Sequence, residues 1–199
     1  MADQVSTADR PLSKSQALRR RRIIDAALVL VRQQGHAQTQ MRDIADASEL
    51  ALGTVYRYFP SKEMLLASVF EVWCEGYWEM LGNAAEGQAN VDRLIDLARR
   101  SSQAYIDERN ILTMLNSLRS ANEPAITEKF SLINRRAAQF FLDNLHGLPD
   151  EAATGIVDTI FCVMAVKLAA LSAEQISTDQ VYEDIEKTVR LLLEFRDDT

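Results

Sequence analysis

Apolar residues recur at spacings of three and four positions through most of this 199-residue chain. That period places them on one face of an α-helix, and beyond its first third the chain shows none of the alternation typical of strands. Glycine and proline interrupt the pattern at Gly35, Pro60, Gly82, Pro124 and Pro149, where helices are expected to end or begin. The pattern therefore predicts an all-α protein of about nine helices.

The segment Gln40–Glu63 predicts two short helices joined by a tight turn, followed by a third, capped helix. Thr39 is the expected N-cap of the first of them. Ile44, Val55 and Phe59 lie at helical spacing on the side that would be buried. Two short helices that cross around a tight turn form a helix-turn-helix, which places its second helix in the major groove of DNA.

The accessible positions of this unit carry groups suited to DNA contact. Gly53 costs about 1 kcal/mol relative to alanine in a helix, which favours a close approach to another backbone at this position. Ser61 caps the next helix, and its first turn holds Lys62, which suits a phosphate site. We expect DNA contacts from Arg22, Thr39, Gln40, Arg42, Leu52, Gly53, Thr54, Tyr56, Arg57, Tyr58 and Lys62. The alternative is a helical hairpin whose polar residues only face water.

Charge is distributed unevenly along the chain, whose net charge is −7. Residues 1–62 hold ten Lys and Arg against six Asp and Glu, giving +4, and residues 63–199 hold twelve against twenty-three, giving −11. The basic part can lie on phosphates while the acidic part stays clear of the duplex. The run Arg19–Arg22 heads the first helix after a polar arm, residues 1–15, expected to be disordered. These arginines would reach phosphates or the minor groove, or form only a solvated charge run.

The same segment resembles the N-terminal signature of TetR-family transcriptional regulators. The matching residues, between about Arg20 and Leu66, are Gly35, Ile44-Ala45, Gly53-Thr54-Val55-Tyr56, Tyr58-Phe59 and Ser61-Lys62-Glu63. The resemblance implies a three-helix DNA-binding domain over residues 16–62 and a larger helical effector-binding and dimerisation domain over residues 63–199. The Met41-Arg42 pair and the run Ala51–Lys62 are also similar to actinobacterial repressors of steroid and lipid catabolism.

Two positions depart from the family pattern. Glu49 stands where the family commonly has glycine in the turn, and Ala51 stands where it commonly has a serine cap. A left-handed Glu49 would be strained by roughly 1–2 kcal/mol, which favours a turn built differently. Ala51 removes a hydroxyl that often meets a phosphate.

The segment Ile156–Leu171 is apolar almost all round, interrupted chiefly by Asp158, Thr159 and Lys167. A helix of this composition is buried on more than one side. With the ninth and last helix it would form a four-helix interface between two copies of the chain, as the resemblance also implies. The alternative is the central helix of a monomer. A two-fold dimer would place two recognition helices about 34–36 Å apart, matching a palindromic operator.

A cavity for an effector is expected between the middle helices, because helix bundles build ligand sites from facing side chains. The candidate lining residues are Trp73, Tyr77, Tyr105, Met114, Leu118, Phe130, Phe141, Phe161 and Met164. Simple core packing is the alternative for each of them. We expect a small, mostly apolar effector, with or without a carboxylate or acyl-thioester group. An acidic effector would meet one of the arginines at 99, 100, 119, 135 and 136.

The chain lacks the residue sets that catalysis requires. His36 and His146 each lie beside a glycine expected to end a helix, and no metal-ligand spacing or glycine-rich phosphate loop accompanies them. We therefore expect no enzyme activity, no cofactor and no metal. Cys74 and Cys162 lie in apolar helical surroundings and are expected to be buried free thiols.

These observations together predict a ligand-responsive DNA-binding regulator, a dimeric repressor released from its operator by the effector. The alternative is an architectural or protein-interaction module that binds DNA without regulating a promoter. The chain has no run of eighteen apolar residues and no apolar segment at its N-terminus. We therefore expect a cytoplasmic protein without a membrane partner.

Overall fold

The computed structural model describes residues 13–82, 89–121 and 123–194, and within these ranges the chain forms nine helices and no strand. This confirms the all-α prediction. The helices are α1 (Lys14–Gln38), α2 (Met41–Ala47), α3 (Leu52–Tyr58), α4 (Lys62–Leu81), α5 (Asn90–Asp107), α6 (Arg109–Ser120), α7 (Pro124–Leu142), α8 (Asp150–Ser172) and α9 (Thr178–Glu194).

The N-terminal arm expected over residues 1–15 lies largely outside the described residues. Helix α1 begins at Lys14, two residues earlier than expected, because Ser13 caps it. The Ser13 hydroxyl accepts from the Gln16 N–H at 3.3 Å, and the Gln16 side chain accepts from the Ser13 N–H at 2.8 Å. This reciprocal pair is a capping box, which satisfies two backbone donors at once.

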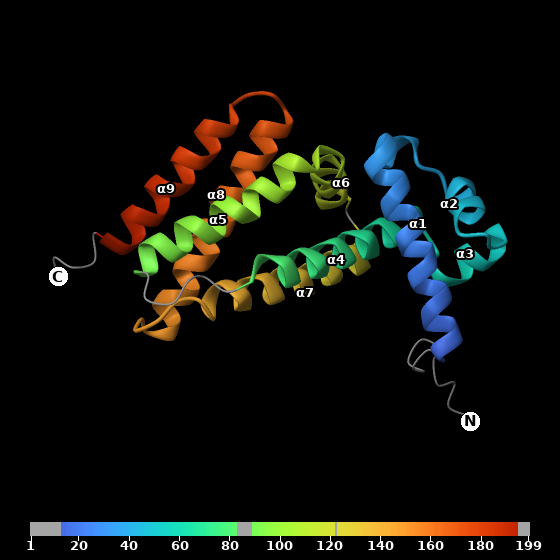
Figure 1. Cartoon of the computed structure of the whole chain (residues 1–199), viewed down its shortest axis with the longest axis horizontal. Helices are drawn as coiled ribbons and strands as arrows, with labels where there is room; N and C mark the ends of the chain where they lie inside the picture. The colour runs from blue at the N-terminus through green and yellow to red at the C-terminus, as the bar shows by residue number, and fades with distance from the viewer. Residues whose placement is uncertain (1–12, 83–88, 122, 195–199) are drawn as a thin grey trace.

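Helices α1, α2 and α3 form a compact unit at one end of the molecule, and α4 leads away from it (Figure 1). The side chains of Ile23, Ile44 and Val55 meet there and are 0% exposed. Helices α2 and α3 have seven residues each. Isolated helices of that length are unstable in water, so this apolar contact holds both in place.

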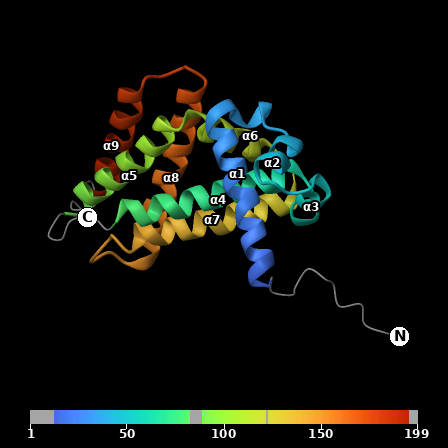
Figure 2. The same ribbon diagram turned by 45° about the vertical axis from the view of Figure 1, so that its right-hand side comes forward.

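The chain from α4 onward is a helical bundle in which α4 lies beside α7, and α5, α8 and α9 group at the opposite end (Figures 1 and 2). Helix α6 contacts α1 and so connects the bundle to the N-terminal unit. One buried cluster joins Ile23 of α1 with Leu65 of α4 and Met114 of α6. The apolar core thus runs across the expected boundary between residues 62 and 63, and that boundary stays a prediction.

Among the described helices, α8 is the one that is long and apolar enough to fit a membrane span as well. Core and interface helices of folded proteins have the same composition. Only 33% of its most apolar window is buried within the chain. Val166 on this helix is 65% exposed, and Cys162 is exposed as well. The prediction that Cys162 is buried is wrong, because it borders a cavity instead of the packed core; Cys74 is buried as predicted.

Candidate nucleic-acid interface and effector cavity

Helix α3 presents one accessible face. Val55 and Phe59, four positions apart, turn inward and are at most 2% exposed. Gly53, Tyr56 and Arg57 are exposed on the other side, with Tyr56 at 47%. The predicted residues Leu52, Thr54 and Tyr58 on the same helix are half-buried. The face therefore offers two large polar side chains and a glycine that allows close approach of another backbone.

Tyr58 and Lys62 follow this face toward α4. The Tyr58 hydroxyl is buried with no hydrogen-bond partner among the described residues, and the Arg57 guanidinium lies 5.7 Å from the Tyr58 ring centroid. Lys62 Nζ lies 3.5 Å from the Ala37 carbonyl oxygen, a long and weak contact. Ser61 caps α4 as predicted, since its hydroxyl accepts from the Met64 N–H at 3.1 Å.

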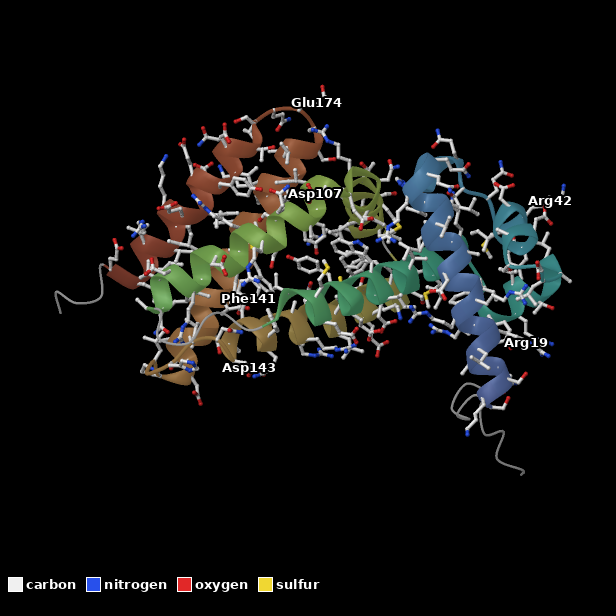
Figure 3. The ribbon with its side chains drawn as sticks, viewed as in Figure 1. Arg19, Arg42, Asp107, Phe141, Asp143 and Glu174 are labelled. Carbon is white, nitrogen blue, oxygen red and sulfur yellow. The ribbon has the colours of Figure 1, made fainter. Side chains whose placement is uncertain are left out.

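Helix α2 places Gln40 and Arg42 in solvent near the outer end of the unit, where Arg42 is labelled in Figure 3. The prediction that Thr39 caps α2 and faces DNA is wrong. Thr39 is 0% exposed, and its hydroxyl donates to the Gly35 carbonyl at 2.8 Å. Gln40 is the N-cap residue instead, and its N–H donates to the Asp43 carboxylate at 3.1 Å. The helix break at Gly35 (φ 80°) leaves a free carbonyl that Thr39 satisfies.

The turn between α2 and α3 keeps the geometry of a glycine turn although its residue is glutamate. Glu49 has φ 51°, and its N–H donates to the Asp46 carbonyl at 3.0 Å. The Leu50 N–H donates to the Ala45 carbonyl at 3.0 Å. These two bonds form a Schellman motif. The differently built turn that the sequence favoured is not observed, because the Glu49 carboxylate forms an ion pair with Arg22 of α1.

The arginine run lies in the second turn of α1, and its members make different contacts. Arg20 donates to the Ser68 hydroxyl of α4 at 3.2 Å and lies 5.2 Å from the Phe59 ring centroid. Arg21 pairs with Asp25 at 2.8 Å. Arg19, labelled in Figure 3, is exposed. Arg20 therefore joins α1 to α3 and α4, a role that the sequence run did not reveal because its partner is 48 positions away.

A cavity of about 670 Å³, called the effector cavity below, lies between α4, α5, α6, α7 and α8. Six of the nine predicted residues line it: Trp73, Tyr77, Tyr105, Phe141, Phe161 and Met164. The other three, Met114, Leu118 and Phe130, do not line it and belong to the packed core. Phe70, Cys74 and Trp78 also line the cavity, and the sequence gave no reason to choose them over other helical apolar residues.

Aromatic rings form one wall of this cavity. Trp73 lies 5.9 Å from Tyr77 with the rings 9° from parallel, and 4.9 Å from Tyr105. Burial raises the pKa of the Tyr105 hydroxyl well above its ordinary value and that of Tyr77 to about 12. Burial likewise raises the pKa of the Cys74 thiol. These groups are therefore neutral near pH 7, and the wall presents aromatic and weakly polar surface.

Of the five arginines that the sequence offered for an acidic effector, only those without a carboxylate partner among the described residues line the cavity. Three of the five arginines considered from the sequence have carboxylate partners: Arg99 with Glu186, Arg100 with Asp96 and Arg136 with Glu75. Arg119 and Arg135 line the cavity and form no ion pair within the described residues. The Asp158 carboxyl lines it too. The cavity thus combines an apolar body with two cationic groups and one anionic group.

Comparison with known proteins supports the same interpretation of the N-terminal unit. Residues 23–69 match the family described as bacterial regulatory proteins, tetR family. The chain is 31% identical over 186 residues to the HTH-type transcriptional repressor KstR of Rhodococcus jostii (strain RHA1), covering 91% of this chain and 85% of that protein. This kinship confirms the expectation of a regulator rather than an enzyme.

Solved structures share the fold of the whole chain. A TetR transcriptional regulator from Rhodococcus sp. RHA1 superposes with a TM-score of 0.78 at 23% identity, covering 90% of this chain and 98% of that one. Thermus thermophilus FadR, a repressor solved in complex with lauroyl-CoA, has a TM-score of 0.71 at 24% identity, covering 89% and 94%. With the helix-turn-helix in place and a repressor matched over most of both sequences, the chain belongs to the TetR family of bacterial regulatory proteins.

Proposed function

We propose that this protein is a repressor that binds a palindromic operator as a dimer and leaves it when a small, mostly apolar effector binds. The proposal rests on two features that one continuous apolar core connects. They are the exposed face of the recognition helix and the aromatic cavity. Such a core lets two sites bias one conformational equilibrium, which is what ligand-controlled DNA binding requires. As a regulator of bacterial genes the protein would act in the cytoplasm.

We assign the major-groove contacts to α3. Gly53 permits close approach, Tyr56 and Arg57 reach outward, and the half-buried Thr54 offers a hydroxyl at the same face. Backbone phosphates would meet Gln40, Arg42 and Lys62 at the edges of that face. Leu52 and Tyr58 would add apolar contact there. Arg22 would contribute only when a phosphate replaces its partner Glu49. This arrangement follows the general division between base contacts and phosphate contacts.

We assign dimerisation to α8 and α9, which lie at the end of the molecule opposite α2 and α3 (Figure 1). Val166 on α8 and Leu191 on α9 are 65% and 60% exposed, large fractions for apolar side chains. A second copy related by a two-fold axis would cover both at once, since isologous interfaces use the same patch on each subunit.

We assign the effector to the aromatic cavity. Its volume of about 670 Å³ falls in the range of pockets for small molecules, and its wall suits an apolar ligand. Arg119 and Arg135 favour an effector that also carries an anionic group, such as a carboxylate or an acyl thioester of an acidic carrier. The lauroyl-CoA complex of the similar Thermus thermophilus repressor is a precedent for such a ligand on this fold.

The proposal is tested by selecting genomic fragments with the purified protein at near-physiological salt, followed by footprinting of the selected fragments. A short two-fold symmetric footprint overlapping promoters is expected. Binding that is sequence-independent and lost with modest salt would instead identify an architectural DNA-binding protein, because nonspecific binding rests on phosphate contacts alone.

A further inference from the structure

A second cavity, of about 640 Å³, lies between α1, α4 and α5, and we call it the junction cavity. Leu28 of α1, Val72 of α4 and Ala104 of α5 are among the residues that line it. It therefore lies where the N-terminal unit meets the helical bundle.

Trp73 and Tyr77 line both cavities. Their stacked rings thus stand between the effector cavity on one side and the junction cavity on the other. Trp73 is 6% exposed, so in this structure its ring is packed rather than free in either space. Gly76, one turn along the same helix, lines the junction cavity, and a Cβ added there would meet nothing within 4 Å. The junction cavity consequently has room for a ring that leaves its present position.

The indole of Trp73 forms a hydrogen bond with the Glu108 carboxylate, which also holds α1. Its Nε1–H donates to Glu108 Oε1 at 2.8 Å. The two oxygens of the same carboxylate accept from Nη2 and Nε of Arg32, each at 2.6 Å. Arg32 lies in α1, and Glu108 lies between α5 and α6. A fork of two parallel hydrogen bonds is the strongest common geometry for an arginine and a carboxylate.

A second bond strengthens this attachment. Asn110 Nδ2 donates to the Arg32 carbonyl oxygen at 2.9 Å. Partial burial favours the neutral form of Glu108, but the hydrogen bonds from Arg32 and Trp73 outweigh it and lower the pKa of the carboxyl below its ordinary value of 4.5. Glu108 is therefore charged near pH 7. Hydrogen bonds from Trp73 to Glu108 and from Arg32 to Glu108 thus connect the wall of the effector cavity to α1.

We propose that the Trp73 ring moves when an effector binds in the effector cavity, and that this movement is transmitted to α1 through Glu108 and Arg32. This inference rests on the proposed function. An effector in the aromatic cavity displaces the Trp73 ring into the junction cavity, which Arg32 and Glu108 also line, so that the ring disturbs their ion pair and its N–H loses Glu108. The carboxylate then reorients, its fork with Arg32 weakens, and α1 shifts with the helix-turn-helix that packs on it. The intact chain of bonds belongs to the operator-binding state, and differential ligand affinity for the two states drives the change.

The test measures operator affinity without any ligand. Trp73→Phe keeps a packed ring and removes the N–H donor, and Glu108→Gln keeps the shape and removes the charge that holds Arg32. The control is Arg99→Gln, which breaks the Arg99–Glu186 pair at 2.7 Å. That pair has side-chain exposures of 47% and 31%, close to the 48% and 27% of Arg32 and Glu108, and it joins α5 to α9 far from α1.

Glu108→Gln and Trp73→Phe are expected to weaken operator binding by about 5- to 150-fold, the usual range of allosteric coupling. The double variant should bind the operator no more weakly than the more strongly affected single variant, because both changes interrupt the same series of hydrogen bonds. Arg99→Gln should lower the melting temperature about as much as Glu108→Gln yet leave the operator Kd within about twofold of wild type, since paired surface ions contribute little. A loss of operator affinity in Glu108→Gln but not in Arg99→Gln, at similar melting temperatures, would show that Glu108 transmits the signal and does not only stabilise the fold.

Operator affinities of Glu108→Gln and Trp73→Phe that stay within twofold of wild type would overturn the inference and leave the proposed repressor function intact. Equal weakening by Arg99→Gln, or additive effects in the double variant, would overturn it as well. A wild-type protein that binds no specific operator would instead sink the proposed function, and this inference with it.

Discussion

Glu49 shows how one residue can keep a turn that its own chemistry disfavours. A non-glycine residue in the left-handed region is strained by roughly 1–2 kcal/mol. The two backbone hydrogen bonds of the turn and the ion pair with Arg22 act against that strain. Glu174, with φ 57° after α8, occupies an equivalent position: its N–H donates to Leu171 and the Gln175 N–H donates to Ala170. The described residues thus contain two glutamates in the same strained geometry: Glu49 between α2 and α3, and Glu174, labelled in Figure 3, between α8 and α9.

Replacing Glu49 with glycine is expected to stabilise the fold by about 0.5–1 kcal/mol, the left-handed strain less the extra chain entropy of glycine. It should also tighten DNA binding, because a negative charge is lost and Arg22 is freed for a phosphate. Thermal unfolding and operator titration measure the two effects. Glu174→Gly is the matched control: it should gain similar stability with no change in operator affinity. Weaker DNA binding by Glu49→Gly would show that the carboxylate orients Arg22 productively.

Lys62 tests the phosphate contacts at the same scale. Among the residues that the structure describes, its ammonium makes one long hydrogen bond, at 3.5 Å, so Lys62→Ala should barely affect folding. Operator and random DNA should weaken alike, and the slope of log affinity against log salt should fall by about 1. Titrations at several salt concentrations give the slope. A slope equal to that of the wild type would remove Lys62 from the DNA-contact set.

At the scale of elements, α2 and α3 are too short to be stable alone, so their positions depend on the residues that they bury. Sequence periodicity located both helices through Ile44, Val55 and Phe59, because the burial of these side chains is a property of local spacing. It did not locate Thr39 correctly. The break at Gly35 was expected from the sequence, but the pattern did not indicate that the Gly35 carbonyl would accept from the Thr39 hydroxyl and so turn it inward.

Substitutions at two helical glycines distinguish an effect on folding stability from an effect on DNA binding. A Cβ at Gly53 of α3 or at Gly76 of α4 would meet nothing within 4 Å. Gly76→Ala should stabilise the protein by about 1 kcal/mol, and Gly53→Ala by no more than that, since it lies in the first turn of its helix. Only Gly53→Ala is expected to weaken operator binding, by blocking the approach of the DNA backbone. Unfolding and titration of both variants decide this; equal operator affinities would mean that Gly53 does not lie against DNA.

On the scale of the whole molecule, the basic N-terminal unit and the helices α8 and α9 lie at opposite ends of the long axis (Figure 1). Residues 13–62, which form α1, α2, α3 and the start of α4, hold nine Lys and Arg against four Asp and Glu, while α8 and α9 carry the exposed Val166 and Leu191 at the other end (Figure 1). A dimer joined through α8 and α9 would thus hold two basic units apart with an acidic body between them. This shape suits two half-sites on one face of a duplex.

Val166→Glu tests this assembly. A charge buried without a partner at a two-fold interface is strongly destabilising, so the variant should be monomeric at micromolar concentration. Its operator affinity should fall by at least tenfold because two half-sites are no longer bound together. Light scattering after size exclusion gives the mass. Leu132→Glu on α7, at a residue 45% exposed, is the control and should remain dimeric. A dimeric Val166→Glu would place the interface elsewhere.

The sequence by itself determined the helices, their breaks, the capped start of α4 and the basic N-terminal end, because each depends on neighbours within a few positions. Tertiary structure alone decided which arginines are free, which aromatic residues line a cavity and which cysteine is exposed. These depend on partners far along the chain: Arg32 and Glu108 are 76 positions apart, and Arg22 and Glu49 are 27 apart. Local spacing carries no information about such pairs, since the packing of whole helices brings them together.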